Sequence, residues 1–247
     1  MKIPLSQPDI TKREVDLVLK VLSSNILSIG PMVEEFEKRI AEFVGVKHAI
    51  AVNSGTSGLH LAVRALGIKD GDEVITTPFS FVASSNCILF ERAKPVFVDI
   101  DPDTLNMDIS QIEGKINSKT KAILPVDVFG QAIDMKSIMD IAERYGLKVI
   151  EDACEALGAE YDGQKAGSLA HAAVFAFYPN KQITTAEGGV IVTNDDEVAK
   201  LCRSMRSQGR PITGLWLEHE RLGYNYRMSE LHAALGVAQM ERIKEIL

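Results

Sequence analysis

Short apolar runs rich in β-branched residues alternate with segments of helical periodicity along most of the chain. The apolar runs predict strands at 48–52, 72–77, 95–100, 121–128 and 147–152. Helical spacing between the runs predicts helices at 59–66, 82–91 and 135–145, and Gly67 and Gly146 stand where helices end. Strands that alternate with helices form a mostly parallel sheet covered on both faces, so we predict an α/β fold.

The pattern changes after residue 170. Two strands, at 172–178 and 189–194, bracket a polar segment that contains Lys181. A helix is predicted at 196–207, an irregular stretch follows at 208–227, and Ser229 is placed to cap a last helix. We expect the apolar residues of that helix to pack in the core or at a subunit contact; they are Leu231, Leu235 and Ala238.

Composition narrows the class of protein. The net charge is −7, with 46% hydrophobic and 25% charged residues, which is typical of a globular protein and disfavours nucleic acid as a partner. No apolar run reaches the roughly 18 residues of a transmembrane helix, so no membrane span is predicted. The three cysteines form no CxxC pair and the first ten residues lack a signal-peptide pattern, which predicts a cytoplasmic protein with reduced thiols.

The first candidate site is the segment NSGTSG, between a predicted strand and a predicted helix. Gly55 lets the backbone approach a ligand closely, Thr56 and Ser57 add hydroxyl groups, and a helix N-terminus favours an anion. These features predict a phosphate site. A strand-to-helix turn with Ser/Thr capping would give the same pattern.

Two further residues carry possible chemistry. Asp152 ends an apolar strand, where a carboxylate faces the ligand crevice of a parallel sheet and could hold a protonated ring nitrogen, bind a metal or act as a base. On position alone, a cap of the next helix is slightly favoured. Lys181 lies between two apolar strands, where desolvation makes an amine nucleophilic, although a solvated turn lysine is commoner.

Other chemistries lack their motifs. The five histidines are far apart, with no metal-ligand spacing, and the chain has no GxSxG, P-loop or GxGxxG sequence. By contrast, a phosphate cradle, an acid for a pyridinium nitrogen and an amine for an aldehyde are the needs of pyridoxal 5′-phosphate (PLP). The order of cradle, Asp152 and Lys181 along the chain therefore indicates a PLP site.

The sequence resembles the DegT/DnrJ/EryC1/StrS family of PLP-dependent sugar aminotransferases, which have the type I aminotransferase fold. The resemblance extends from the opening IPLSQPDI to the last helix. It rests on the segments LSIGPMVEEFE, AVNSGTSGLHLA, GDEVITTPFSFVAS, PVFVDIDPDTLNMD, PVDVFGQ, VIEDACEALGAEY, FAFYPNKQITTAEGG and GYNYRMSEL.

The resemblance implies a role for each matching residue. Lys181 would bond the cofactor aldehyde and move protons, and Asp152 would pair with the ring nitrogen. Phe81 would stack on the ring, and residues 55–57 would bind the phosphate. Asn225 would reach the phosphate of a neighbouring subunit, which implies a homodimer with shared active sites.

Three departures from the family pattern stand out. Ala176 replaces a serine whose hydroxyl binds phosphate in many members, and Glu155 replaces a glutamine or histidine near the cofactor. The family also continues into a smaller C-terminal domain that closes the active site. We expect residues 1–235 to form the PLP-binding large domain with an N-terminal arm, and residues 236–247 to begin the connection to that domain, which this chain lacks.

The function implied is transfer of an amino group from an amino acid, with L-glutamate as the expected donor, to a nucleotide-linked ketosugar. Related sugar dehydratases carry histidine in place of the lysine, so Lys181 argues against dehydration. The alternative is a shortened or regulatory relative that binds PLP without turnover.

Overall fold

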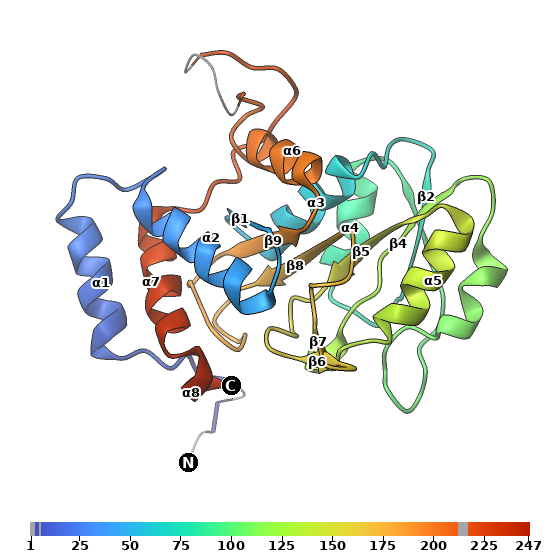
Figure 1. Ribbon diagram of the computed structural model, residues 1–247, viewed down its shortest axis with the longest axis horizontal. Helices are drawn as coiled ribbons and strands as arrows, with labels where there is room; N and C mark the ends of the chain where they lie inside the picture. Colours follow the sequence, from blue (N-terminus) through green and yellow to red (C-terminus); the bar gives the residue numbers. More distant parts are fainter. Residues whose placement is uncertain (1–2, 5, 212–216) are drawn as a thin grey trace.

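The computed structural model describes residues 3–4, 6–211 and 217–247. A seven-stranded sheet forms the centre of the fold, in the order β1-β9-β8-β5-β4-β2-β3 (Figure 1). Only β9 runs against its neighbours in this sheet; the other adjacent pairs are parallel. The strands of the sheet are β1 (His48–Val52), β2 (Glu73–Thr76), β3 (Lys94–Phe97), β4 (Thr120–Ile123), β5 (Lys148–Asp152), β8 (Ala172–Ala176) and β9 (Gly189–Thr193).

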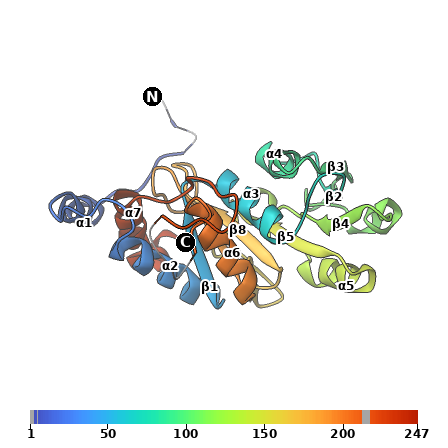
Figure 2. The same cartoon turned by 90° about the horizontal axis from the view of Figure 1, so that it is seen from above.

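Helices cover both faces of the sheet. Helices α3 and α4 lie on one face, and α2 and α5 on the other (Figure 2). A short hairpin of β6 (Glu160–Tyr161) and β7 (Gln164–Lys165) lies outside the sheet. The α-helices are α1 (Lys12–Leu22), α2 (Pro31–Val44), α3 (Gly55–Ala65), α4 (Ala83–Phe90), α5 (Met135–Tyr145), α6 (Asp196–Arg206), α7 (Glu230–Glu241) and α8 (Ile243–Ile246). The 3₁₀ turns are Ile109–Gln111, Glu113–Lys115 and Val128–Gly130.

The predicted α/β fold with a mostly parallel sheet is confirmed, and the strand predicted at 48–52 has the predicted bounds. β4 ends at Ile123, earlier than predicted, because Pro125 has no N–H to donate to the ladder. Pairing resumes irregularly beyond it, where Val126 bridges Asp152. Helices α1 and α2 lie where the apolar pattern gave no element, and part of the stretch predicted to be irregular, 212–216, lies outside the described residues.

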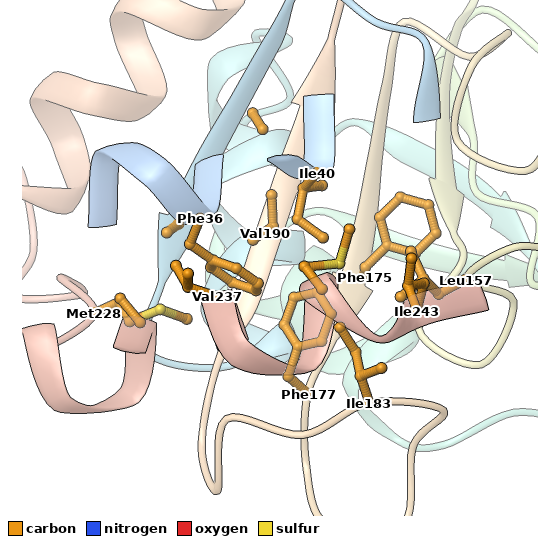
Figure 3. Close-up of a cluster of buried hydrophobic side chains, with 14 of the residues drawn as sticks. Phe36, Ile40, Leu157, Phe175, Phe177, Ile183, Val190, Met228, Val237 and Ile243 are labelled. Carbon is orange, nitrogen blue, oxygen red and sulfur yellow. The ribbon is translucent and has the colours of Figure 1, made fainter. Parts of the chain in front are cut away.

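Helix α7 closes the core on the α2 face of the sheet. Figure 3 shows Val237 of α7 beside Phe36 of α2, and the rings of Phe36 and Phe177 meet edge to face at 5.2 Å. Ala238 is buried in this core, as expected, and Leu231 packs against it. The boundary expected after residue 235 falls inside α7, which continues without a break to Glu241.

One buried carboxylate joins α7 to α2 at a distance of 200 residues in sequence. Glu230 accepts hydrogen bonds from the backbone N–H groups of Gly30 (3.1 Å), Met32 (2.8 Å) and Val33 (3.1 Å). These are donors that the start of a helix leaves without intrahelical partners. The start of α2 is thus capped by a side chain from the other end of the chain.

In the part of the chain that the structure describes, no helix has the length and apolar character that a membrane crossing requires.

Replacing Glu230 by Ala should lower the free energy of unfolding by at least about 2 kcal/mol, because it leaves buried N–H groups without an acceptor. Glu230→Gln keeps one oxygen acceptor, so its free energy of unfolding should fall by less. Urea denaturation of both variants measures the effect, with Glu245→Ala, whose side chain is 76% exposed, as the control. A Glu230→Ala variant as stable as the control would show that the cap contributes nothing.

Candidate active site

The polar residues singled out in the sequence gather at one edge of the sheet. Strands β1, β5 and β8 point in the same direction, so their carboxyl ends meet there. The loop 53–57 follows β1, Asp152 ends β5, and Lys181 follows β8. Segments far apart in sequence thus bring a glycine-containing turn, an acid and an amine to the same edge.

The loop after β1 forms a tight turn into α3. Ser54 caps the helix, accepting a hydrogen bond from the Ser57 N–H at 3.1 Å. Gly55 has no room for a side chain, since an added Cβ would lie 2.8 Å from Cβ of Ala176 and 3.1 Å from Sγ of Cys154. Thr56 lies half-buried in the first turn, where the helix dipole favours an anion. This geometry suits a small phosphate group at the start of α3.

Asp152 is 5% exposed, and both of its carboxylate oxygens are hydrogen-bonded. The Ser84 hydroxyl donates to Oδ2 at 2.6 Å, and the backbone N–H of Cys154 donates to Oδ1 at 3.2 Å. Ser84 is itself 2.7 Å from the Ser80 hydroxyl. These hydrogen bonds fix the orientation of the buried Asp152 side chain.

Lys181 lies in a short loop after β8, with a side chain that is 16% exposed. Its Nζ donates to Oε1 of Glu155 at 2.9 Å, and the other carboxylate oxygen of Glu155 accepts from the Phe129 N–H at 3.0 Å. The Gln182 side chain also donates to the Glu155 backbone carbonyl. Glu155 therefore orients the amine of Lys181 while it ties together two loops at the sheet edge.

Cys154 connects the turn, the acid and the amine. Its thiol lies against Gly55, and its backbone N–H holds Asp152. Burial raises the pKa of the Cys154 thiol, the nearby Asp152 carboxylate raises it further, and the Lys181 ammonium opposes the rise. The thiol is therefore protonated, and it lies within electrostatic reach of both Asp152 and Lys181.

Helix α3, which begins at Gly55, holds the segment that carries Asn225 in place. His60 of α3 is buried, and burial lowers its pKa, so its ring is neutral. Nε2 then donates to Glu91 at 2.8 Å, and Nδ1 accepts from the Tyr226 hydroxyl at 3.2 Å. The backbone N–H of Asn53 also donates to the Tyr226 carbonyl at 2.9 Å. Asn225 itself is exposed beside this anchored residue.

Two other predicted residues are placed as follows. The Phe81 side chain is 77% exposed in the turn before α4, one helical turn from Ser84. Ala176 ends β8 and packs its methyl group on Gly55, so it brings no hydroxyl to the turn. The sequence analysis did not single out Ser84, although its position three residues after Phe81 could have pointed to it. It also missed His60, for which the sequence contains no local signal.

A second pair of acids lies on the opposite side of β5 from Asp152. Asp127 and Glu151 are almost fully buried, and each has one carboxylate oxygen without a hydrogen-bond partner among the described residues. Burial raises the pKa of Asp127 to about 6 and raises that of Glu151 well above its ordinary range. Two adjacent buried carboxyl groups of this kind share a proton.

Comparison with known proteins identifies the family. Residues 8–247 match the model of the DegT/DnrJ/EryC1/StrS aminotransferase family. The chain is 47% identical to GDP-perosamine synthase of Caulobacter vibrioides, over all of this chain and 66% of that protein. The chain belongs to the DegT/DnrJ/EryC1/StrS aminotransferase family, and the resemblance found in the sequence is confirmed.

Solved structures agree with this assignment. Helicobacter pylori PseC, an aminotransferase involved in the biosynthesis of pseudoaminic acid, has a TM-score of 0.95 and 38% identity, with 99% of this chain and 67% of that chain covered. The PLP form of the putative sugar aminotransferase Spr1654 from Streptococcus pneumoniae has a TM-score of 0.93 and 31% identity, with 99% and 68% covered. The chain thus spans about two thirds of the length of these relatives, in a family whose cofactor is PLP.

The residues present fit PLP. Gly55 lets the start of α3 pack closely against Ala176 and Cys154, and a hydrogen-bonded acid and a partly buried amine lie at the same sheet edge. A helix start, an acid and an amine are what the phosphate, the ring nitrogen and the aldehyde of PLP would each require.

The buried pair Asp127 and Glu151 should make the free energy of unfolding fall as pH rises. The pKa of Asp127 is about 6 in the folded chain and about 4 when unfolded, so the folded state holds the extra proton between these values. Its contribution, on the order of 3 kcal/mol, is present below pH 4 and lost as pH rises through 6. Asp127→Asn should flatten this loss, since an amide N–H can donate to Glu151. Urea unfolding at several pH values tests this, and equal pH dependence in both proteins would contradict it.

Proposed function

We propose that this chain is the cofactor-binding part of a PLP-dependent aminotransferase that passes an amino group from L-glutamate to a nucleotide-linked ketosugar. The observation that carries the proposal is the meeting of Lys181, Asp152 and the turn at Gly55 at one edge of the sheet. The relatives support the substrate class, since one is named for a GDP-linked sugar and others are named sugar aminotransferases.

When bound, PLP supplies an aldehyde that takes up the amino group and a ring that withdraws electrons from the carbon that loses its proton. Asp152 would hold a proton on the ring nitrogen. Burial strengthens this interaction, because no solvent screens the carboxylate, and Ser84 keeps it aimed in one direction.

Lys181 would bind the aldehyde and then carry a proton between cofactor and substrate carbon. The amine Nζ of Lys181 donates a hydrogen bond to Glu155 at 2.9 Å. Glu155 would accept that hydrogen bond again whenever Nζ is released from the cofactor. Because the Phe129 N–H also holds Glu155, the carboxylate stays in place while the lysine moves.

The start of α3 would bind the phosphate through residues 55–57, with the hydroxyl groups of Thr56 and Ser57 as donors. No hydroxyl comes from Ala176, so the backbone N–H groups carry more of this task here. The exposed ring of Phe81 is available to stack on the pyridine ring.

The assembly would be a homodimer in which Asn225 reaches the phosphate in the other subunit. Its exposure, on a segment anchored to α3 through Tyr226, supports this role. Residues 1–235 would form the PLP-binding domain, and residues 236–247 the start of the connection to a smaller domain. Because α7 crosses position 235 and packs in the large-domain core, the two parts would be rigidly joined.

Borohydride reduction of the PLP-treated chain should fix the cofactor on Lys181, because this partly buried amine lies in the loop after β8 at the carboxyl edge of the sheet. Peptide mass spectrometry locates the label. Lys181→Ala should lose it, and the control Lys136→Ala, at an exposed position of α5, should keep it. Labelling of a different lysine in the wild-type chain would overturn the proposal.

Asp152→Asn should slow the reaction of the PLP-loaded chain with L-glutamate by about 100- to 1000-fold, while PLP is still fixed on Lys181. A neutral amide cannot stabilise a protonated ring nitrogen. Stopped-flow absorbance measures the rate, and Asp140→Asn, on the exposed side of α5, is the matched control. An unchanged rate in Asp152→Asn would remove Asp152 from its assigned role.

A further inference from the structure

A basic cavity lies beside the edge strand β1, apart from the residues assigned to PLP. Its volume is about 190 Å³, whereas one water molecule needs roughly 10–15 Å³. The start of α2 at Gly30 forms one wall, the end of α6 supplies Arg203 and Arg206, and Arg227 and Met228 form another wall. The space is therefore large enough for a ligand and is lined by three guanidinium groups.

Two of the three guanidinium groups are paired with a carboxylate of the cavity. Glu37 is the buried acid, and it accepts from both Arg203 (2.6 Å) and Arg206. The remaining donors of these arginines reach the backbone carbonyls of Ala49 (2.9 Å) and Ala51 (2.6 Å). The other acid of the lining, Glu34, is exposed to solvent. Glu230, behind the wall at Gly30, is occupied by the backbone N–H groups of Gly30, Met32 and Val33. Among the described residues, none of these acids pairs with Arg227.

Arg227 has the weakest compensation of the three. Among the described residues its guanidinium donates to the neutral side chain of Gln208, at 3.2 Å. Burial, together with the charges of Arg210 and Arg206, lowers the pKa of Arg227. A half-buried cation that is repelled by its neighbours gains most from a bound anion.

The backbone connects this cavity to the candidate active site. The rings of Tyr224 and Tyr226 stack at 4.9 Å on the side of His60, so the alternation of an extended segment turns Asn225 and Arg227 to the other side. Arg227 bridges Val52, the last residue of β1, next to the turn at Gly55. Arg227 thus lies two residues from the residue proposed to enter the shared site.

We propose that this cavity binds the diphosphate of the nucleotide-linked substrate, with Arg227 as the main contact. The inference rests on the proposed function, which supplies a substrate of that class. Planar guanidinium groups match phosphate oxygens through paired hydrogen bonds, and a diphosphate offers several such oxygens. The carboxylate of an amino-acid donor offers fewer oxygens and less charge, so it fits the cavity less well.

The test uses the chain with PLP already fixed on Lys181 by borohydride, so that the phosphate site at Gly55 is filled. Inorganic pyrophosphate is titrated into it by calorimetry. We expect saturable binding that weakens by at least about tenfold in Arg227→Gln and by less in Arg227→Lys, which keeps the charge. Arg144→Gln is the control, because it removes an exposed arginine of α5 that is paired with Glu113. This variant should bind pyrophosphate as the wild type does.

GDP should displace pyrophosphate, and L-glutamate should not. Equal pyrophosphate affinity in the wild type and in an Arg227→Gln chain with unchanged circular dichroism would overturn the inference. Displacement by L-glutamate but not by GDP would also overturn it, because the cavity would then serve the amino donor. Failure to fix PLP on Lys181 would contradict the proposed function itself, so the two failures are distinguishable.

Discussion

The site depends on one constraint, which is that a charged acid must be kept at the buried end of a parallel strand. A carboxylate that is 5% exposed is costly unless donors surround it. Ser84 and the Cys154 N–H supply those donors, and both lie at the carboxyl edge of the sheet. The contact with Ser84 fixes α4 against β5, and Cys154 packs on Gly55 at the start of α3. Satisfying Asp152 therefore also sets the relative positions of the segments that make up the site.

Strand β5 separates two acidic environments. Asp152 faces α4 and accepts a hydrogen bond on each carboxylate oxygen, while Glu151, on the opposite face, lies against Asp127 without enough donors for two charges. The difference follows from the alternation of side chains along a strand and from what each face offers. The protein thus holds one fully hydrogen-bonded carboxyl group where a ring nitrogen would meet it, and leaves a shared proton on the far side.

Much of this could be predicted from the sequence, and the remainder has a clear physical cause. The apolar runs predicted the sheet strands, and the rule that ligands lie beyond strand ends pointed to Gly55, Asp152 and Lys181. The partners of these residues were not predictable, because Ser84 meets Asp152 across 68 positions and Glu155 meets Lys181 across 26. No local pattern encodes such contacts. The capping of α2 by Glu230 across 200 positions is a further case.

The most direct test of this account is the protonation state of the PLP ring nitrogen bound to this chain, measured by NMR with ¹⁵N-labelled cofactor. The Asp152 carboxylate, oriented by Ser84 and Cys154, should keep that nitrogen protonated at neutral pH. In Asp152→Asn the nitrogen should lose its proton. An unprotonated nitrogen in the wild-type chain, or the same chemical shift in both proteins, would contradict the account.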